Sequence, residues 1–119
     1  MGEAAIIPLG IKLCMGQRTM LMRPSGAISA EFLLYTLMSP VIKRLIERTA
    51  VGTGVKHLRV GDVELLPIPI PPNAEQHRIV AEVARLLSVA AETETEIEND
   101  RLRADRLRQT LLASAFSSK

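Results

Sequence analysis

The chain of 119 residues has little aromatic or sulfur chemistry, with two Phe, one Tyr, no Trp and a single cysteine, Cys14. The lone cysteine excludes an internal disulfide and a cysteine-rich zinc site, and it favours a reducing compartment, the cytoplasm. With so few aromatics, the core must be aliphatic. A chain of this length can build one modest core and an extension, but not two complete domains.

Long apolar runs are also missing. No stretch approaches the roughly 20 residues that a membrane span needs, and the early Glu3 and the short apolar run after it do not form a signal peptide. We therefore expect a soluble protein with no membrane association. Fifteen Lys and Arg against thirteen Asp and Glu give a net charge of +2, so any contact with nucleic acid must use a local basic patch.

No constellation of catalytic residues is present. His57 and His77 lie far apart in the sequence without a metal-ligand partner at helical spacing, and Cys14 has no neighbouring histidine to activate it. The Gly52–Gly54 segment lacks the flanking pattern of a phosphate-binding loop. The sequence therefore predicts a protein that is not an enzyme and has no metal site and no cofactor.

The first part of the chain has short apolar runs broken by proline and glycine. Runs of this length predict two or three short strands. The candidate strands are Ala5–Leu9, Ile11–Cys14 and Arg18–Met22.

Apolar residues at helical spacing follow Ser29, which is a suitable N-cap. Pro40 cannot donate a hydrogen bond to the carbonyl four residues earlier, so a helix here must kink or divide near Ser39. The pattern predicts two helical pieces, 30–39 and 40–49.

A proline-rich connector precedes the last part of the chain. Each residue before a proline is pushed away from helical backbone, so Leu66, Ile68 and Ile70 should be extended and the connector stiff. Beyond Asn73 there is neither glycine nor proline, which predicts one helix from Asn73 to about Phe116, roughly 60 Å long at 1.5 Å per residue.

This helix carries an apolar seam with alternating steps of four and three residues. Its positions are Ile79, Val83, Leu86, Ala90, Thr93, Ile97, Asp100, Ala104, Leu107, Leu111 and Ser114. Acidic residues from Glu92 to Asp100 precede basic residues from Arg101 to Arg108, so an antiparallel pair of helices would place acid against base. The sequence therefore predicts an α+β fold, with a small partial domain over 1–72 and a coiled-coil helix over 73–119 that pairs antiparallel.

A basic segment lies in the glycine-rich turn before the connector. Lys56, His57 and Arg59 can present donors to phosphates or guanine edges, and Lys12 and Arg18 can extend the same patch. The alternative interpretation is a solvated surface loop.

Four segments taken in order resemble the C-terminal half of the DNA specificity subunit of type I restriction-modification systems. They are ISAEFLLYTLMSP, VGTGVKHLRVGDVELLPIPIPP, EQHRIVAEVARLL and LRQTLLASAF. The most specific part is Pro71-Pro72 followed by Glu75-Gln76 and Ile79-Val80. The resemblance covers nearly the whole chain.

The resemblance implies a non-catalytic subunit that reads double-stranded DNA. In this family a target recognition domain reads half of a split DNA site, and long helices act as a spacer and as a docking surface for the methyltransferase (modification) subunits. Adenine methylation with S-adenosylmethionine and ATP-driven cleavage belong to partner subunits, so the restriction subunit is an indirect partner. Carried over to this chain, helix pairing and subunit docking fall to Glu75, Gln76, Ile79, Val83, Leu86, Ala90, Ile97, Leu107 and Leu111.

One departure from the family concerns length. Family subunits usually carry two recognition domains and two helical regions, so we expect this chain to be a fragment or a truncated form. A homodimer through the last helix would then restore two-fold symmetry. The alternative is a helix-pairing assembly or regulatory module that does not bind DNA itself.

Overall fold

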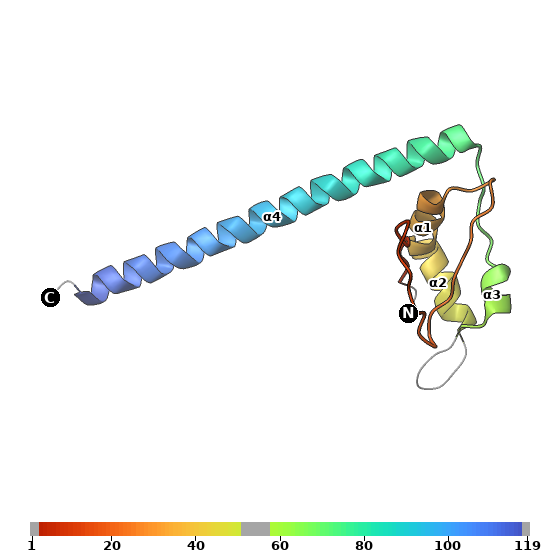
Figure 1. The fold of residues 1–119 in the computed structure, drawn as a ribbon. Coiled ribbons are helices and arrows are strands. Elements are labelled where there is room, and N and C mark those ends of the chain that lie inside the picture. The colour runs from red at the N-terminus through yellow and green to blue at the C-terminus, as the bar shows by residue number, and fades with distance from the viewer. Residues whose placement is uncertain (1–2, 51–57, 118–119) are drawn as a thin grey trace. The chain divides into compact units, whose positions relative to one another are not determined.

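The computed structural model describes residues 3–50 and 58–117. Contacts within the chain divide it into two units, Met1–Ala81 (unit 1) and Glu82–Lys119 (unit 2). Unit 1 contains an extended N-terminal segment, three helices, the proline connector and the first turns of a fourth helix, and unit 2 contains the rest of that helix (Figure 1). The boundary placed between residues 72 and 73 from the sequence stays a prediction.

The strands predicted in the N-terminal segment do not form, so the β part of the α+β prediction is wrong for the described residues. Residues 3–25 lack regular secondary structure, with turns at 9–10 and 17–18. Gly10 adopts φ 81°, which its missing Cβ permits, and the Thr19 N–H closes the second turn on the Gly16 carbonyl at 3.2 Å. A strand is defined by hydrogen bonds to a neighbouring strand, whereas the local bonds here close turns.

The alternation expected of strands is nevertheless present in this segment. Apolar side chains at every second position line one shallow hollow, and most of them are exposed. The lining residues are Ile7, Leu9, Ile11, Leu13, Met15, Leu21 and Arg23. The alternating sequence pattern thus places apolar side chains on one face of the segment, but the segment does not pair into a sheet.

Helices α1 (Ala30–Met38) and α2 (Pro40–Thr49) confirm the two predicted helical pieces. The Ser29 hydroxyl accepts from the Phe32 N–H at 3.1 Å and caps α1. Ser39 is extended between the helices, and Pro40 occupies the first turn of α2, where its missing N–H leaves no intrahelical bond unmade. The sequence therefore located this break correctly.

A small aliphatic core forms between α1, α2 and the connector. Leu37, Ile42 and Ile46 are buried, and Leu66 and Ile68 of the connector pack against them. This arrangement confirms the predicted aliphatic core, although Phe32 of α1 is also buried. The one-turn helix α3 (Val60–Glu64) precedes the connector and was not predicted, because five residues containing Gly61 carry no helical periodicity.

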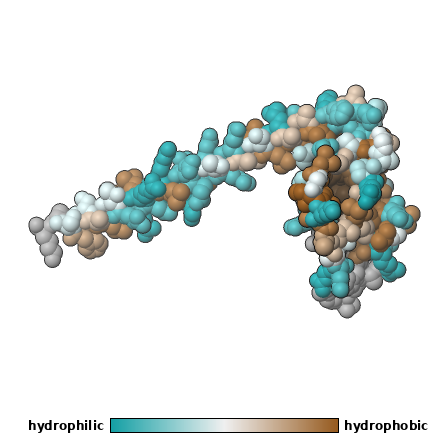
Figure 2. Space-filling model, in the orientation of Figure 1, coloured by the Kyte–Doolittle hydropathy of each residue, from teal (hydrophilic) through white to brown (hydrophobic). Residues whose placement is uncertain are grey.

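Helix α4 (Asn73–Ser117) has the bounds that the sequence predicted. The connector before it contains no helix, in line with its prolines. In unit 2 every side chain from Ala84 to Ser117 is exposed, and hydrophobic residues recur along its surface between hydrophilic ones (Figure 2). The structure contains one copy of the chain, so pairing of this helix stays a prediction.

Candidate nucleic-acid and subunit interface

The first turn of α4 is attached to the rest of unit 1 by one buried amide, that of Gln76. Its side chain is 1% exposed and is the one buried polar side chain among the described residues. The amide oxygen Oε1 accepts from the Ser29 N–H at 2.9 Å. The amide nitrogen Nε2 donates to the Ala27 carbonyl at 2.8 Å and to the Pro71 carbonyl at 2.9 Å.

This network explains why a glutamine suits the position. A primary amide has two N–H donors and a carbonyl acceptor, so both ends of Gln76 can be satisfied inside the chain. Pro71 offers a carbonyl but no N–H of its own, and that carbonyl is taken up by Gln76. The sequence assigned Gln76 to subunit docking, a role that stays a prediction, while its side chain is already occupied within unit 1.

Two ion pairs lie on the first turns of α4, and in each a glutamate is followed three residues later by an arginine. Arg78 donates to both carboxylate oxygens of Glu75, and this hydrogen bond holds the pKa of Glu75 below its ordinary value, against a smaller opposing effect of burial. Arg85 pairs with Glu82 in the same way, and the hydrogen bond raises the pKa of the Arg85 guanidinium. Pairs of this spacing support an exposed helix by a few tenths of a kcal/mol each.

The remaining residues of the predicted docking set lie along α4. Ile79 and Val83 are partly buried, whereas Leu86, Ala90, Ile97, Leu107 and Leu111 are exposed. Leu107, for example, is 61% exposed and Leu111 62%. An apolar stripe on the surface of a helix is typical of a surface that another helix covers.

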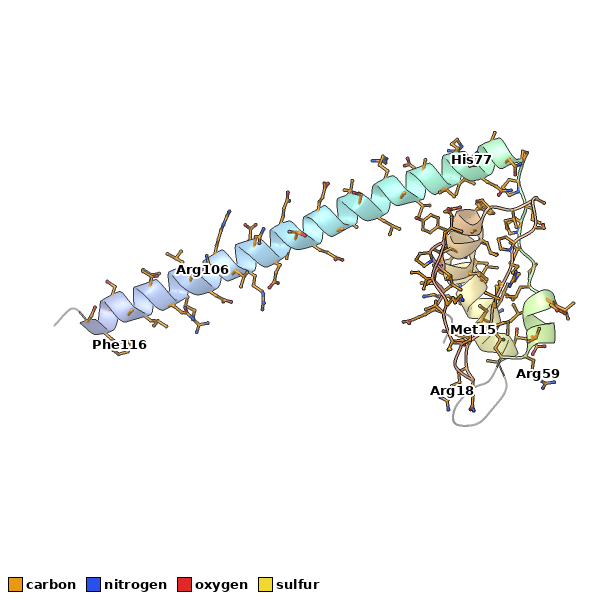
Figure 3. The ribbon with its side chains drawn as sticks, in the orientation of Figure 1. Met15, Arg18, Arg59, His77, Arg106 and Phe116 are labelled. Atoms are coloured by element: carbon orange, nitrogen blue, oxygen red, sulfur yellow. The ribbon has the colours of Figure 1, made fainter. Side chains whose placement is uncertain are left out.

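The predicted DNA-binding residues are only partly described. Lys12 and Arg18 are exposed, and the Arg59 side chain is 71% exposed with its guanidinium 4.0 Å from the Asp62 carboxylate. Figure 3 shows Arg18 and Arg59 toward the same end of unit 1. Lys56 and His57 lie outside the described residues.

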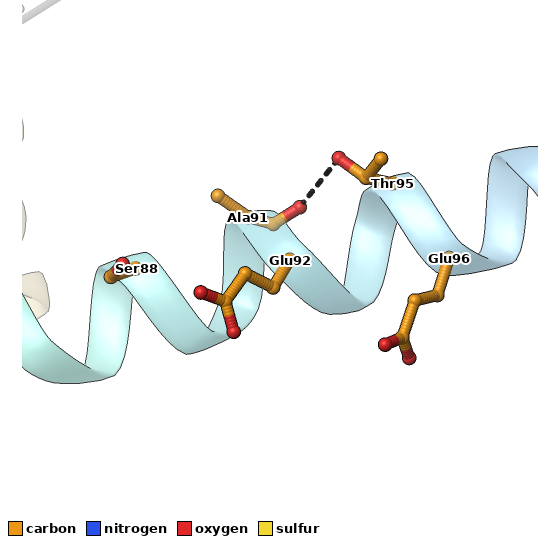
Figure 4. Close-up of a pocket in the computed structure, with 5 residues that line it drawn as sticks. All are labelled: Ser88, Ala91, Glu92, Thr95 and Glu96. Carbon is orange, nitrogen blue, oxygen red and sulfur yellow. Dashed lines mark hydrogen bonds between the residues drawn. The ribbon is translucent and has the colours of Figure 1, made fainter.

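Concave features in the part of the chain that the structure describes do not form an enclosed site. One hollow lies on the surface of α4 itself, lined by Ser88, Ala91, Glu92, Thr95 and Glu96. Figure 4 shows that a single helix supplies all five, with the Thr95 hydroxyl bound to the Ala91 carbonyl at 3.0 Å. Residues 3–50 and 58–117 also contain no group of three His, Cys, Asp or Glu side chains placed to hold a metal ion. None of the helices described is both long enough and apolar enough to cross a membrane.

Comparison with known proteins identifies a family that this chain matches. The family model described as type I restriction modification DNA specificity domain matches residues 1–100. This chain belongs to that specificity family. The match confirms the resemblance seen in the sequence, and it includes the whole of unit 1 and the first part of unit 2.

Individual members of the specificity family match at modest identity. The chain is 33% identical to the type I restriction enzyme EcoBI specificity subunit of Escherichia coli over 85 residues, which is 71% of this chain and 18% of the relative. It is 26% identical to the EcoKI specificity subunit of Escherichia coli strain K12 over 118 residues, 99% of this chain and 25% of that relative. The chain thus spans a quarter or less of these relatives' length. No solved structure matches it.

Proposed function

We propose that this chain serves as a DNA specificity subunit, or part of one, in a type I restriction-modification complex. In this role it contributes to recognition of double-stranded DNA and docks the methyltransferase subunits, without catalysing a reaction or holding a cofactor. The supporting observation is the combination of a family match over residues 1–100 with a helix that exposes an apolar stripe. A cytoplasmic location follows from the DNA partner.

The basic end of unit 1 is the proposed DNA contact. Arg18 and Arg59 carry exposed guanidinium groups, which suit phosphate and guanine. Lys12, Lys56 and His57 are the further members of the proposed patch. The first role of such a patch is electrostatic, so its contribution should depend on salt.

A salt titration of DNA binding tests this proposal. Fluorescence anisotropy with a labelled duplex compares the protein with an Arg18→Ala, Arg59→Ala double variant. Each phosphate contact removed should reduce the slope of log affinity against log salt by about 0.9, so the double variant should lose about 1.8. The control is Arg106→Ala with Arg108→Ala, which removes the same charge from α4. Equal slopes in the two double variants would contradict a DNA contact at this end of unit 1.

Docking of the methyltransferase subunit is assigned to α4. Light scattering of the chain with an added methyltransferase subunit should show a complex whose mass is the sum of both. We also propose that α4 mediates a homodimer, because an exposed apolar stripe is most simply covered by a second copy.

A second candidate function is a helix-pairing assembly or regulatory module without DNA binding of its own. The full exposure of α4 from Ala84 to Ser117 favours a pairing role whether or not unit 1 contacts DNA. Retained uptake of the methyltransferase subunit, with no duplex binding even at low salt, would select this candidate.

A further inference from the structure

The seam of α4 in unit 2 has an uneven distribution of large and small side chains. Large residues stand near its ends at Leu86, Leu107 and Leu111, and in the middle Ile97 stands among small or polar residues. All are exposed in the single copy. A second helix covers such a seam best where the facing side chains fill the space between the helices, large against small or apolar against apolar, and where its charges are compensated.

Four charged residues flank the middle of the seam. Glu94 and Arg101 each follow a seam position by one residue, and Glu96 and Arg103 each precede one. In an antiparallel pair of helices, following positions meet following positions and preceding positions meet preceding ones. The charges of these four residues therefore restrict how two antiparallel copies of α4 can be aligned.

We propose that α4 pairs with α4 of a second copy in one antiparallel register, with Ile97 of each copy opposite Asp100 of the other. This inference rests on the proposed homodimer and specifies its interface. In this register Glu94 faces Arg101 of the second copy and Glu96 faces its Arg103. Two-fold symmetry repeats each pair, so all four charged positions on each helix meet an opposite charge.

The same alignment matches the sizes of the seam residues. Ala90 lies opposite Leu107 of the second copy, so a small residue accommodates a large one. Leu86 lies opposite Leu111, which forms an apolar layer at each end of the pair. Thr93 and Ala104 meet between these layers, where two short side chains let the helices approach closely.

Neighbouring antiparallel registers are disfavoured by like charges. Sliding one helix by a heptad in one direction places Glu94 and Glu96 opposite their own counterparts. Sliding it by a heptad in the other direction does the same to Arg101 and Arg103. Like charges in contact repel by amounts similar to the attraction of opposite ones, so only the central register leaves no such contact at these positions.

A parallel, in-register pair of α4 helices is disfavoured for a different reason, which concerns Asp100. It would place the two Asp100 carboxylates against each other inside the seam, and burying two like charges together is strongly unfavourable. In the antiparallel register each Asp100 meets Ile97 instead, and Arg103 of its own helix lies 3.7 Å away as a counter-charge. Arg101 likewise contacts Glu98 of its own helix at 2.8 Å, and the five N–H donors of a guanidinium leave capacity for a second carboxylate.

Paired cysteines test the register directly. In the full chain with Cys14→Ser, the double variant Ala90→Cys, Leu107→Cys should form disulfides between copies on mild oxidation, seen on non-reducing gels, whereas each single variant should not. The control pair Ile97→Cys, Leu107→Cys would face each other only after a one-heptad slide. Cross-linking of Ala90→Cys alone, more efficient cross-linking of the control pair, or a monomer in light scattering of the Cys14→Ser parent would each overturn the proposal.

Charge reversal tests the four flanking residues. Glu94→Arg with Glu96→Arg, and separately Arg101→Glu with Arg103→Glu, should each weaken self-association about tenfold or more. An equimolar mixture of the two variants should restore a dimer, because every Arg then meets a Glu. The control, Glu92→Arg with Asp105→Arg, changes the same charge on the outer face and should leave the dimer intact. A mixture no stronger than either variant would overturn the pairing.

The outcome for the register is separable from that for the proposed function. Uptake of the methyltransferase subunit and duplex binding are measured on the charge-reversal variants, whose substituted residues lie outside the predicted docking set. Loss of self-association with both activities retained supports the register, since only the dimer depends on these residues. A chain that never dimerises yet still takes up the methyltransferase subunit would overturn the register and the homodimer, and would leave the proposed role as a specificity subunit standing.

Discussion

The Gln76 side chain accepts a hydrogen bond from the Ser29 backbone N–H at 2.9 Å, although the two residues are 47 positions apart. Ser29 is also the N-cap of α1, so this bond joins the start of α1 to the first turn of α4. Unit 1 is therefore held together by this polar contact as well as by a core of only a few aliphatic residues.

Replacing Gln76 by alanine should destabilise unit 1. The change leaves the Ser29 N–H and the carbonyls of Ala27 and Pro71 without their partner, and an unsatisfied buried polar group costs about 1–3 kcal/mol. Urea unfolding followed by circular dichroism measures the free energy of unfolding. The control is Gln109→Ala at an exposed position of α4, which should change it little. A loss no larger than that of the control would show that water replaces the three bonds.

Replacing Ile46 by alanine should open a cavity in the aliphatic core. Ile46 is 6% exposed and packs with Leu37 and Ile42, and truncations of this kind cost about 2–5 kcal/mol. Val41 on the same helix is 59% exposed, so Val41→Ala is the matched control with an effect below about 0.5 kcal/mol. Thermal unfolding of both variants gives the comparison, and equal midpoints would argue against the core as described.

Acid should weaken the Glu75–Arg78 pair. The Arg78 hydrogen bond holds the pKa of Glu75 below its ordinary value of 4.5, so the pair stabilises the fold above that pH and the stabilisation is lost as pH falls through the folded value. Glu75→Gln should therefore lower the unfolding midpoint slightly at pH 7 and less at pH 3. Glu92→Gln serves as the exposed control. A midpoint difference for Glu75→Gln that is the same at both pH values would contradict the shift.

A charge placed in the seam should disrupt pairing of α4, whereas a charge placed on the outer face of the helix, away from the seam, should not. Leu107→Asp removes an apolar side chain worth about 1.5–3 kcal/mol on burial and adds a carboxylate that resists desolvation. Light scattering should then show a monomer. Leu102 is 42% exposed on the same helix and lies outside the seam, so Leu102→Asp should leave the dimer in place. An unchanged mass for Leu107→Asp would exclude the seam as the interface.

Much of the helical structure could be predicted from residues close to each helix boundary. The N-cap at Ser29, the break at Pro40 and the start of α4 at Asn73 depend on residues within one turn of each boundary, so the sequence placed them correctly. The prolines likewise excluded helix from the connector. The one-turn helix α3 was not predicted, because a single turn leaves no periodic pattern in the sequence.

For the candidate site too, the sequence revealed the features that depend on local pattern and missed those that depend on contacts between distant residues. Periodicity alone located the apolar stripe of α4, and the model of the specificity family matches the chain over residues 1–100. The sequence did not predict that the Gln76 side chain is hydrogen-bonded inside unit 1. Its partners at Ala27 and Ser29 are distant in sequence, and only packing brings them to the amide.

The sequence by itself determined where α1, α2 and α4 begin and end, the aliphatic character of the core and the family, since each depends on local chemistry or on order along the chain. Only the tertiary structure decided that residues 3–25 stay unpaired and that Gln76 is buried. Both outcomes depend on which distant backbone groups are near enough to accept or donate a hydrogen bond, and that proximity exists only after the chain has folded.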